Sequence, residues 1–175
     1  IYFGGVGFGH IRGRLVVALG AGTGRLSIAS AYFQPLHVFS VDVDPNAIRI
    51  LQKNVRSLEM ARLISPVCVN VGNCTFSLRI RRLNAPITTI MNPPFGVKSK
   101  GADRVFLKNA FNISDVVYSI HLAGEKTRAF LHKYVRKLGW LVDYTFTTNM
   151  VLEKSFPFHS KRRKRIQVDI YKFIQ

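Results

Sequence analysis

The chain has 175 residues, 47% of them hydrophobic and 20% charged, a length and composition that suit a single domain with its own core. Lys and Arg number 26 against 9 Asp and Glu, and the formal net charge of +17 favours a polyanionic partner over a surface of balanced charges. No apolar run approaches the roughly 20 residues that a membrane helix needs, which argues against association with a membrane.

Two cysteines, Cys68 and Cys74, lack the spacing of a metal site and need no disulfide in a chain of this size. We interpret them as buried small residues of a protein in a reducing compartment, which predicts a cytoplasmic location, or a nuclear one in a eukaryote. The sequence starts at Ile1 without a Met. We therefore expect one domain over residues 1–175 with a truncated N-terminal segment.

Short apolar runs alternate with helical patterns along most of the chain. The apolar runs predict buried strands, because they are stopped by glycine, proline or polar residues. Asp44 and Pro45 are typical of a helix N-cap and a first helical residue, and Asp103 is typical of another cap. The expected strands are 15–19, 37–41, 67–69, 87–91 and 116–121, and the expected helices are 26–33, one that begins at 45, 104–111 and 125–137.

Two alternating segments, 140–148 and 166–173, predict two further strands near the C-terminus. The repeated strand–helix order predicts an α/β fold with a doubly wound, mostly parallel sheet and an antiparallel pair at its C-terminal end. In such a sheet the C-terminal ends of neighbouring strands meet at one edge, where ligands bind. His121 ends the fifth strand, and we interpret it as a structural residue.

Gly20, Gly22 and Gly24 lie between the first strand and the first helix, where glycines allow a tight turn and close approach of a ligand. Asp42 ends the next strand, and a carboxylate there can accept hydrogen bonds from both hydroxyls of a ribose. Nicotinamide enzymes share this arrangement, but the spacing lacks the G-x-G-x-x-G pattern of dinucleotide sites. The turn therefore favours a cofactor without a pyrophosphate.

The motif Asn92, Pro93, Pro94, Phe95 follows the fourth strand at the same edge. The two prolines fix φ and lack amide donors, which leaves rigid, outward carbonyls. Because the exocyclic amine of adenine is a poor nucleophile, hydrogen bonds from it to the Asn92 side-chain oxygen and the Pro93 carbonyl would favour a reactive, tetrahedral nitrogen. Phe95 would stack on the extruded base. The motif predicts methylation of an adenine amine, with a purely structural turn as the alternative.

A run of five cations lies between the last two expected strands and follows His159 and two phenylalanines. A second basic cluster, over 79–82, precedes the fourth strand. A solvated loop or a nuclear-import signal would also be rich in cations. Because aromatic side chains adjoin the cations, we favour RNA contacts made by His159, Lys161, Arg162, Arg163, Lys164 and Arg165.

Several segments together resemble one known family: V-D-V-D at 41–44, M-N-P-P-F-G at 91–96, A-D-R-V-F-L at 102–107, D-V-V-Y-S-I-H at 115–121, F-H at 158–159 and V-D-I-Y at 168–171. They look like the ribosomal-RNA adenine-N6 methyltransferases of the methyltransferase-like-five family, and most of all like its archaeal branch. The resemblance implies a Rossmann-like class I methyltransferase fold, S-adenosylmethionine as cofactor, and one adenosine of small-subunit ribosomal RNA as substrate. It also implies a small zinc-binding activator protein at the edge of the third strand, at least in eukaryotes.

The resemblance implies no metal and assigns the catalytic role to Asn92, Pro93, Pro94 and Phe95, and cofactor contacts to Gly20, Gly22, Gly24, Asp42, Val43, Asn73 and Asn92. Three features depart from the family pattern. The family's N-terminal Gln-Tyr-x-Thr-Pro segment is not found in this sequence, Ala18 replaces an acid before the glycine turn, and Asn73 replaces an acid after the third strand. A non-catalytic RNA-binding relative stays open as an alternative, as does a protein glutamine N5 methyltransferase, which shares the Asn-Pro-Pro start.

Overall fold

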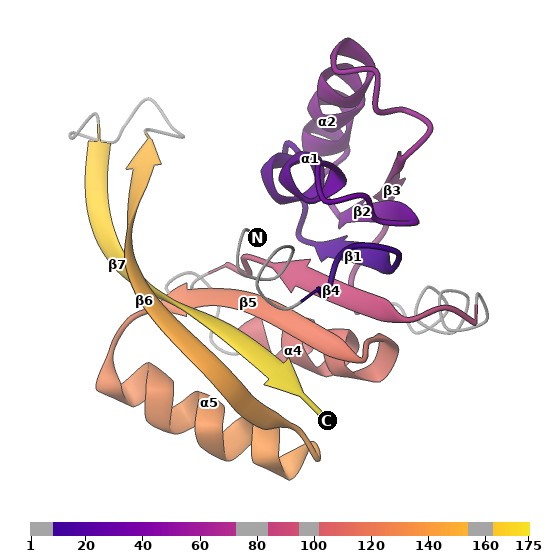
Figure 1. Cartoon of the computed structure of the whole chain (residues 1–175). Coiled ribbons are helices and arrows are strands. Elements are labelled where there is room, and N and C mark those ends of the chain that lie inside the picture. The colour runs from indigo at the N-terminus through magenta and orange to yellow at the C-terminus, as the bar shows by residue number, and fades with distance from the viewer. Residues whose placement is uncertain (1–8, 73–83, 95–101, 154–162) are drawn as a thin grey trace.

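A computed structural model describes residues 9–72, 84–94, 102–153 and 163–175 (Figure 1). The described strands are β1 (Leu15–Leu19), β2 (His37–Asp42), β3 (Ile64–Cys68), β4 (Ile87–Met91), β5 (Val116–Leu122), β6 (Leu141–Glu153) and β7 (Arg163–Ile174). The described helices are α1 (Arg25–Ala31), α2 (Pro45–Ser57), α4 (Ala102–Ile113) and α5 (Glu125–Lys137). None of these helices is long and apolar enough to cross a bilayer.

All of these strands belong to one sheet in the order β3-β2-β1-β4-β5-β7-β6. β1 pairs in parallel with both β2 and β4, and β3 and β5 extend the parallel part on either side. β7 lies between β5 and β6 and runs antiparallel to both. The strand order therefore reverses between β1 and β4, and ligands bind in such sheets at the C-terminal ends of these strands. The predicted doubly wound sheet with an antiparallel C-terminal pair is confirmed.

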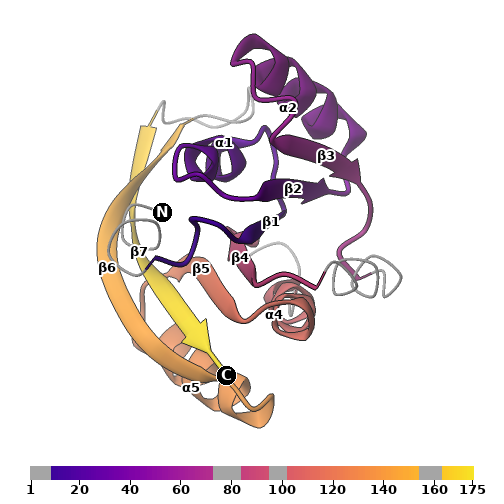
Figure 2. The same cartoon turned by 45° about the vertical axis from the view of Figure 1, so that its right-hand side comes forward.

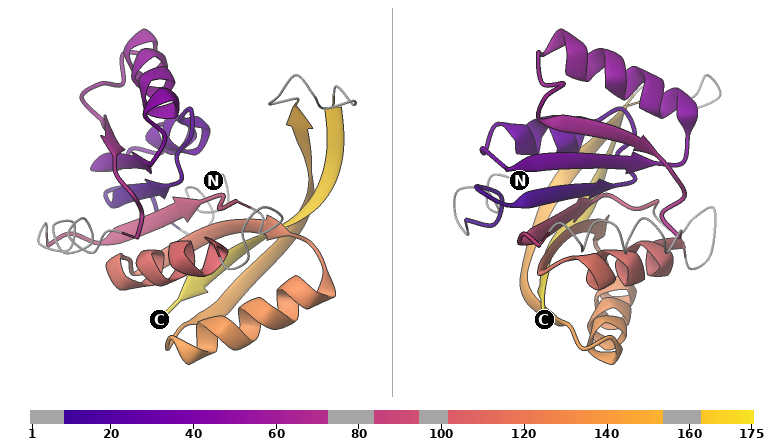
Figure 3. Two further views of the ribbon diagram at one scale, coloured as in Figure 1. Left: turned by 180° about the vertical axis from the view of Figure 1, so that it is seen from behind. Right: turned by 90° about the vertical axis from the view of Figure 1, so that its right-hand side faces the viewer.

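Helices cover both faces of the parallel part of the sheet (Figure 3). All five residues of the central strand β1 are buried, and alternate residues belong to two apolar clusters, one on each face of the sheet. Leu15, Val17 and Leu19 pack with residues of α4 and α5, whereas Val16 and Ala18 pack with residues of α1 and α2. Successive strand residues point to opposite faces, so a strand at the centre of three layers must be apolar throughout.

β6 and β7 form a long curved hairpin whose far end extends past the parallel strands (Figures 1 and 2). We expected the basic run 161–165 to lie between two strands, but residues 163–165 are the first of β7 and pair with β6. The expectation was wrong because residues 161–165 are all cations, and a run of charges carries no apolar pattern. Such a run lacks the alternation of apolar and polar residues by which a half-buried strand is detected.

The third strand starts at Ile64, although the sequence predicted 67–69. Ser65 and Pro66 interrupt the apolar pattern, and proline lacks an amide donor. Among the described strands β3 pairs only with β2, and proline is tolerated in such an edge strand. Cys68 is exposed and not buried as expected, because it ends a strand whose outer edge no described strand covers.

One of the two predicted helix caps is found in the structure, and the other is not. Asp44 caps α2 as predicted, because its Oδ1 accepts a hydrogen bond from the Asn46 N–H (2.9 Å). α5 has the predicted bounds. α4 begins before the expected cap, so that Asp103 lies inside its first turn. The Asp103 carboxylate is therefore close to the positive end of the α4 dipole.

Gly24→Ala should lower the stability of the fold more than an ordinary glycine substitution. Gly24 begins α1 with a φ of +96°, and an added Cβ would overlap Cδ1 of Leu51 in α2. The left-handed backbone costs a residue with a side chain about 1–2 kcal/mol, and overpacking adds about 1–3 kcal/mol. We expect urea denaturation to show a loss of about 2–5 kcal/mol in the free energy of unfolding.

Gly13→Ala is the matched control, because Gly13 has a φ of +66° and open space around its Cβ position. This variant should lose only about 1–2 kcal/mol from backbone strain. Equal losses in the two variants would show that the contact between Gly24 and Leu51 is not limiting.

Candidate active site

The turn between β1 and α1 depends on a left-handed backbone at its glycines. Gly20, Gly22 and Gly24 have φ values of 66°, 54° and 96°, which residues with a side chain rarely adopt. At Gly20 an added Cβ would lie 3.0 Å from Cε1 of Phe106, so the missing side chain lets α4 approach the turn. The Ala21 N–H donates to a carbonyl oxygen of β2 (2.9 Å), which holds the turn against the neighbouring strand.

Asp42 joins the glycine turn to the end of β2. Its Oδ2 accepts a hydrogen bond from the Gly22 N–H (2.7 Å), and its Oδ1 accepts one from the Asp44 N–H (3.0 Å). A carboxylate oxygen has two lone pairs, so each oxygen can accept a second hydrogen bond from a ligand. Two backbone donors therefore fix the orientation of the carboxylate and leave it able to bind.

The glycine turn, Asp42 and the Asn-Pro-Pro motif lie at matching positions on the C-terminal edge of the sheet. Leu19 pairs with Val41 of β2 and with Met91 of β4. The residues that follow these three therefore emerge side by side at the C-terminal edge of the sheet. Strand register thus brings together three motifs that are far apart in the sequence.

A cavity of about 400 Å³ lies at this edge, and we call it the glycine-turn cavity. Its lining includes five residues that the sequence singled out, together with residues that follow β3 and residues of α4. The lining residues are Gly20, Asp42, Val43, Asn70, Val71, Asn92, Pro94, Val105 and Phe106. Asp42 is the one carboxylate among them. The described part of the chain contains no cluster of His, Cys, Asp or Glu that could hold a metal ion.

Asn92 directly follows β4 and presents an unpaired acceptor at this cavity. Its side-chain oxygen Oδ1 is buried and has no hydrogen-bond partner among the described residues. An unpaired buried acceptor costs about 1–3 kcal/mol, and such atoms in native proteins call for an explanation, such as a catalytic role. An N–H donor of a ligand in the glycine-turn cavity would supply the partner.

The remaining predicted site residues have other positions. Gly22 and Gly24 shape the turn without lining the cavity. Arg163, Lys164 and Arg165 lie in β7. Five predicted residues lie outside the described part of the chain: Asn73, Phe95, His159, Lys161 and Arg162.

Four residues that line the glycine-turn cavity were not predicted from the sequence. Asn70 and Val71 follow β3, and the rule that ligands bind at the C-terminal strand ends could have found them. Val105 and Phe106 lie in α4, where two apolar residues of an amphipathic helix carry no sign of a binding role. Their position against the glycine turn depends on how α4 packs.

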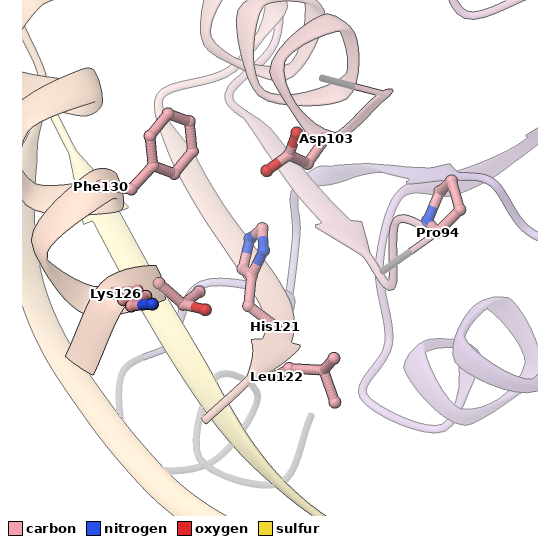
Figure 4. Close-up of a pocket in the computed structure, with 7 residues that line it drawn as sticks. Pro94, Asp103, His121, Leu122, Lys126 and Phe130 are labelled. Atoms are coloured by element: carbon pink, nitrogen blue, oxygen red, sulfur yellow. The ribbon is translucent and has the colours of Figure 1, made fainter. Parts of the chain in front are cut away.

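A second cavity, of about 290 Å³, shares Pro94 with the first, and we call it the α4–α5 cavity (Figure 4). It is bounded by the ends of β4 and β5 and by the first turns of α4 and α5. Its lining residues are Pro94, Asp103, His121, Leu122, Lys126, Thr127 and Phe130. Unlike the glycine-turn cavity, it contains groups of both charges.

His121 is held as a neutral imidazole in the wall of the α4–α5 cavity. The residue is only 4% exposed, and its Nε2 lies 2.7 Å from Oγ of Ser119. Burial lowers the pKa of His121 to about 4, against the opposite effect of the Asp103 and Asp169 carboxylates. At pH 7 the ring therefore has one donor nitrogen and one acceptor nitrogen.

An ion pair between the buried Asp169 and the exposed Arg128 fixes the start of α5 on the sheet. Asp169 of β7 is fully buried and lies opposite His121 of β5. The Arg128 guanidinium donates to both Asp169 carboxylate oxygens (2.8 and 3.0 Å), and the Thr147 hydroxyl donates to one of them (2.7 Å). The bonds from Arg128 are the main reason that the pKa of Asp169 stays below its usual range despite burial. This anchor positions the α5 wall of the cavity.

The strand order, the glycine turn, the β2 carboxylate and the Asn-Pro-Pro motif after β4 define a class I methyltransferase. Residues 10–90 match the model of the TRM5/TYW2 methyltransferase domain. The sequence is 32% identical to the rRNA N(6)-adenosine-methyltransferase METTL5 of Danio rerio, over 95% of this chain and 78% of the relative. The chain belongs to the METTL5 family of rRNA N6-adenosine methyltransferases.

Archaeal proteins are similar to the chain over nearly its whole length. The protein MJ0284 of Methanocaldococcus jannaschii is 30% identical over 90% of this chain and 72% of its own length. The crystal structure of PH1948 from Pyrococcus horikoshii, described provisionally as an RNA methyltransferase, superposes with a TM-score of 0.86. It is 38% identical over 99% of this chain and 80% of its own. The predicted family, fold class and cofactor are confirmed.

The glycine-turn cavity fits S-adenosylmethionine, the cofactor of this class. Asp42 would hold the ribose, since its carboxylate oxygens can still accept from hydroxyls, and the apolar residues Val71, Val105 and Phe106 would face the adenine ring. Ala18, which stands where the family has an acid, is buried in β1 and does not line the cavity. Asp42 therefore provides the negative charge of the site.

Asp42→Ala should remove most of the affinity for S-adenosylmethionine. Hydrogen bonds to charged groups contribute about 1.5–3 kcal/mol, so titration calorimetry should show a dissociation constant that is about 10- to 100-fold higher. Asp44→Ala is the matched control, because it removes a neighbouring carboxylate that caps α2 and does not line the cavity. The control should lose about 1 kcal/mol of stability and bind the cofactor normally. Unchanged affinity in Asp42→Ala would contradict the assignment.

When the pH falls from 7 to 5, the free energy of unfolding of the wild-type protein should decrease more than that of a His121→Gln variant. The folded pKa of about 4 lies below the ordinary value of 6.5, so falling pH protonates the unfolded chain first and stabilises it. The contribution of His121 is complete above pH 6.5 and disappears toward pH 4. At about 1.4 kcal/mol per pH unit, the wild type should lose about 2 kcal/mol more than the variant at pH 5.

Urea denaturation of both proteins at the two pH values measures this difference. Burial also lowers the pKa of His10 and His37, but both residues are present in both proteins and their effects cancel. The same pH dependence in both proteins would show that His121 is not buried in its neutral form.

Proposed function

We propose that this chain transfers the methyl group of S-adenosylmethionine to the N6 amine of an adenosine in ribosomal RNA. The observation that carries the proposal is the buried, unpaired Oδ1 of Asn92 at the glycine-turn cavity. Membership of a family whose Danio rerio relative is named as an rRNA N6-adenosine methyltransferase supports the choice of substrate. The formal net charge of +17 agrees with an RNA partner.

Asn92 can activate an amine by accepting a hydrogen bond from it. The lone pair of the adenine amine is delocalised into the ring, and an N–H···Oδ1 bond favours a nitrogen on which that pair is localised. The acceptor is preorganised, because Asn92 continues β4 and precedes two residues of fixed φ. We assign stacking on the base to Phe95, which lies outside the described residues and follows Pro94 in the chain.

The reaction needs no strongly basic side chain at the site. S-adenosylmethionine, when bound, supplies an electrophilic methyl group on a positively charged sulfur. A methylated amine nitrogen carries a positive charge and loses its proton readily. Among the residues that line the glycine-turn cavity Asp42 is the one acid, and two backbone N–H groups already hold it toward the ribose position. Catalysis therefore depends on positioning and hydrogen bonding.

We assign RNA contacts to the basic end of the β6–β7 hairpin. Arg163, Lys164 and Arg165 begin β7, and Arg165 is exposed. The hairpin extends past the parallel strands (Figure 1), so its cations can reach phosphates at a distance from the catalytic edge. His159, Lys161 and Arg162 belong to the same basic run outside the described residues.

Two further expectations from the family resemblance remain part of the proposal. A small zinc-binding activator would bind at β3, the strand whose outer edge no described strand covers. The cytoplasm is the proposed location, or the nucleus in a eukaryote, because ribosomal RNA is the proposed substrate.

Asn92→Ala should abolish most methyl transfer while keeping cofactor affinity within a few-fold. Loss of one preorganised hydrogen-bonding group typically costs about 10²- to 10³-fold in rate. Single-turnover transfer of a labelled methyl group to small-subunit ribosomal RNA measures the rate, and mass spectrometry of nucleosides identifies the product as N6-methyladenosine.

Asn70→Ala is the matched control for Asn92→Ala. Asn70 lines the same cavity, but its Oδ1 already accepts a hydrogen bond from the Gly72 N–H (2.9 Å). This variant should keep the wild-type rate at saturating cofactor. An undiminished rate in Asn92→Ala would refute the assigned role, and a wild type that binds cofactor and RNA without methyl transfer would favour a non-catalytic relative.

A further inference from the structure

Methyl transfer to adenine leaves the α4–α5 cavity unexplained. Its walls come from four elements, with Pro94 after β4, Asp103 on α4, His121 at the end of β5 and Phe130 on α5. Figure 4 shows these side chains around one space. Pro94 also lines the glycine-turn cavity, so an RNA whose adenosine is bound at Asn92 passes next to this second space.

The lining of the α4–α5 cavity combines the groups that recognise a nucleotide. Phe130 offers an aromatic ring, Asp103 a carboxylate acceptor, Lys126 an ammonium group and Thr127 a hydroxyl. The neutral His121 adds one donor or acceptor nitrogen without a charge. Single-stranded RNA is recognised in this way, because its unstacked bases pack on aromatic rings and their edges form hydrogen bonds.

We propose that the α4–α5 cavity binds a nucleotide adjacent to the methylated adenosine, with its base against Phe130, its base edge at Asp103 and its phosphate at Lys126. This inference rests on the proposed function, because a bound RNA substrate is what brings a neighbouring nucleotide to Pro94. It adds a site that selects the sequence around the target adenosine.

Contacts of α5 with β7 and α4 position the α5 wall of the pocket. The Arg128–Asp169 pair fixes the first turns of α5 on β7. The Arg104 guanidinium lies over the Phe130 ring, 5.0 Å from its centroid, and Phe130 stacks on Tyr134 with centroids 5.4 Å apart. These contacts orient the ring of Phe130, and because Arg104 and Tyr134 lie against it, a base would pack on the part of the ring that lines the cavity.

Asp103 is the residue that we expect to recognise the base, by accepting a hydrogen bond from it. It is the one carboxylate among the lining residues, and α4 and α5 together contain more cations than acids. A carboxylate repels the phosphate backbone, so its favourable role at an RNA site is to accept an N–H of a base. Cytosine and guanine present exocyclic amines, whereas the N3–H of uracil lies between two carbonyl oxygens that repel a carboxylate. Asp103 should therefore favour an amine-bearing base over uracil.

A binding selection on a defined RNA pool tests this site. The pool consists of single-stranded RNAs with one adenosine at a fixed central position and C, G or U at every other position, which fixes the register. RNA bound by the full chain in the presence of S-adenosylhomocysteine is separated and sequenced. We expect cytosine or guanine over uracil by about tenfold at one position beside the adenosine, in line with a good base contact.

Two variants distinguish recognition of the base by Asp103 from contact of Lys126 with the phosphate. Asp103→Asn keeps the shape of the side chain and loses its charge, and it should reduce the preference at that position to about twofold or less. Lys126→Ala should weaken binding uniformly across the pool. Lys137→Ala, at the far end of α5 and outside the cavity lining, is the matched control and should weaken binding less.

The outcomes distinguish this inference from the proposed function. Equal enrichment of the three bases beside the adenosine, or a preference that persists in Asp103→Asn, would overturn the nucleotide pocket. Equal effects of Lys126→Ala and Lys137→Ala would overturn the phosphate contact. Methyl transfer is measured on the same pool. A pool that shows the preference but receives no methyl group would overturn the proposed function and support the pocket.

Discussion

The rest of the site depends on the hydrogen bonds that Asp42 accepts from the backbone. The Gly22 and Asp44 N–H groups hold its two oxygens at 2.7 and 3.0 Å, and so they fix the turn after β1 against the end of β2. Because the same strand register places Met91 beside Leu19, the Asn-Pro-Pro motif emerges next to that turn. One carboxylate thus orders the turn beside the glycine-turn cavity and can still accept hydrogen bonds from a ligand there. A cofactor cavity and an amine acceptor meet at this edge as a consequence.

The two cavities are linked, because both are lined by Pro94 and by residues of α4. α4 contributes Phe106 to the glycine-turn cavity and Asp103 to the α4–α5 cavity. α5 is fixed by the Arg128–Asp169 pair, and Pro94 belongs to both linings. A shift of α4 would therefore change both cavities at once. The arrangement suits an enzyme that must hold a cofactor and a strand of RNA in one register.

Much of the fold could be predicted from the sequence, because buried parallel strands and capped helices leave local patterns. β1, β4 and α5 have the expected bounds, and Asp44 caps α2 as expected. The errors fall where tertiary context replaces local pattern. β3 tolerates Pro66 because it is an edge strand, and residues 163–165 are strand residues because they pair with β6 beyond the core. The family and cofactor were also predictable, since short motifs with a chemical role recur in order along the chain.

The sequence by itself determined the chemistry that is available: a glycine turn, a carboxylate at the end of the next strand, an Asn-Pro-Pro motif and a large excess of cations. Each of these is a local property of residue type and spacing. Only the tertiary structure decided that Oδ1 of Asn92 is buried without a partner among the described residues and that Phe106 lies against Gly20. It also decided that His121 is buried and neutral beside Asp103. Burial, dielectric environment and cavity shape depend on residues that are distant in the sequence, so no local pattern encodes them.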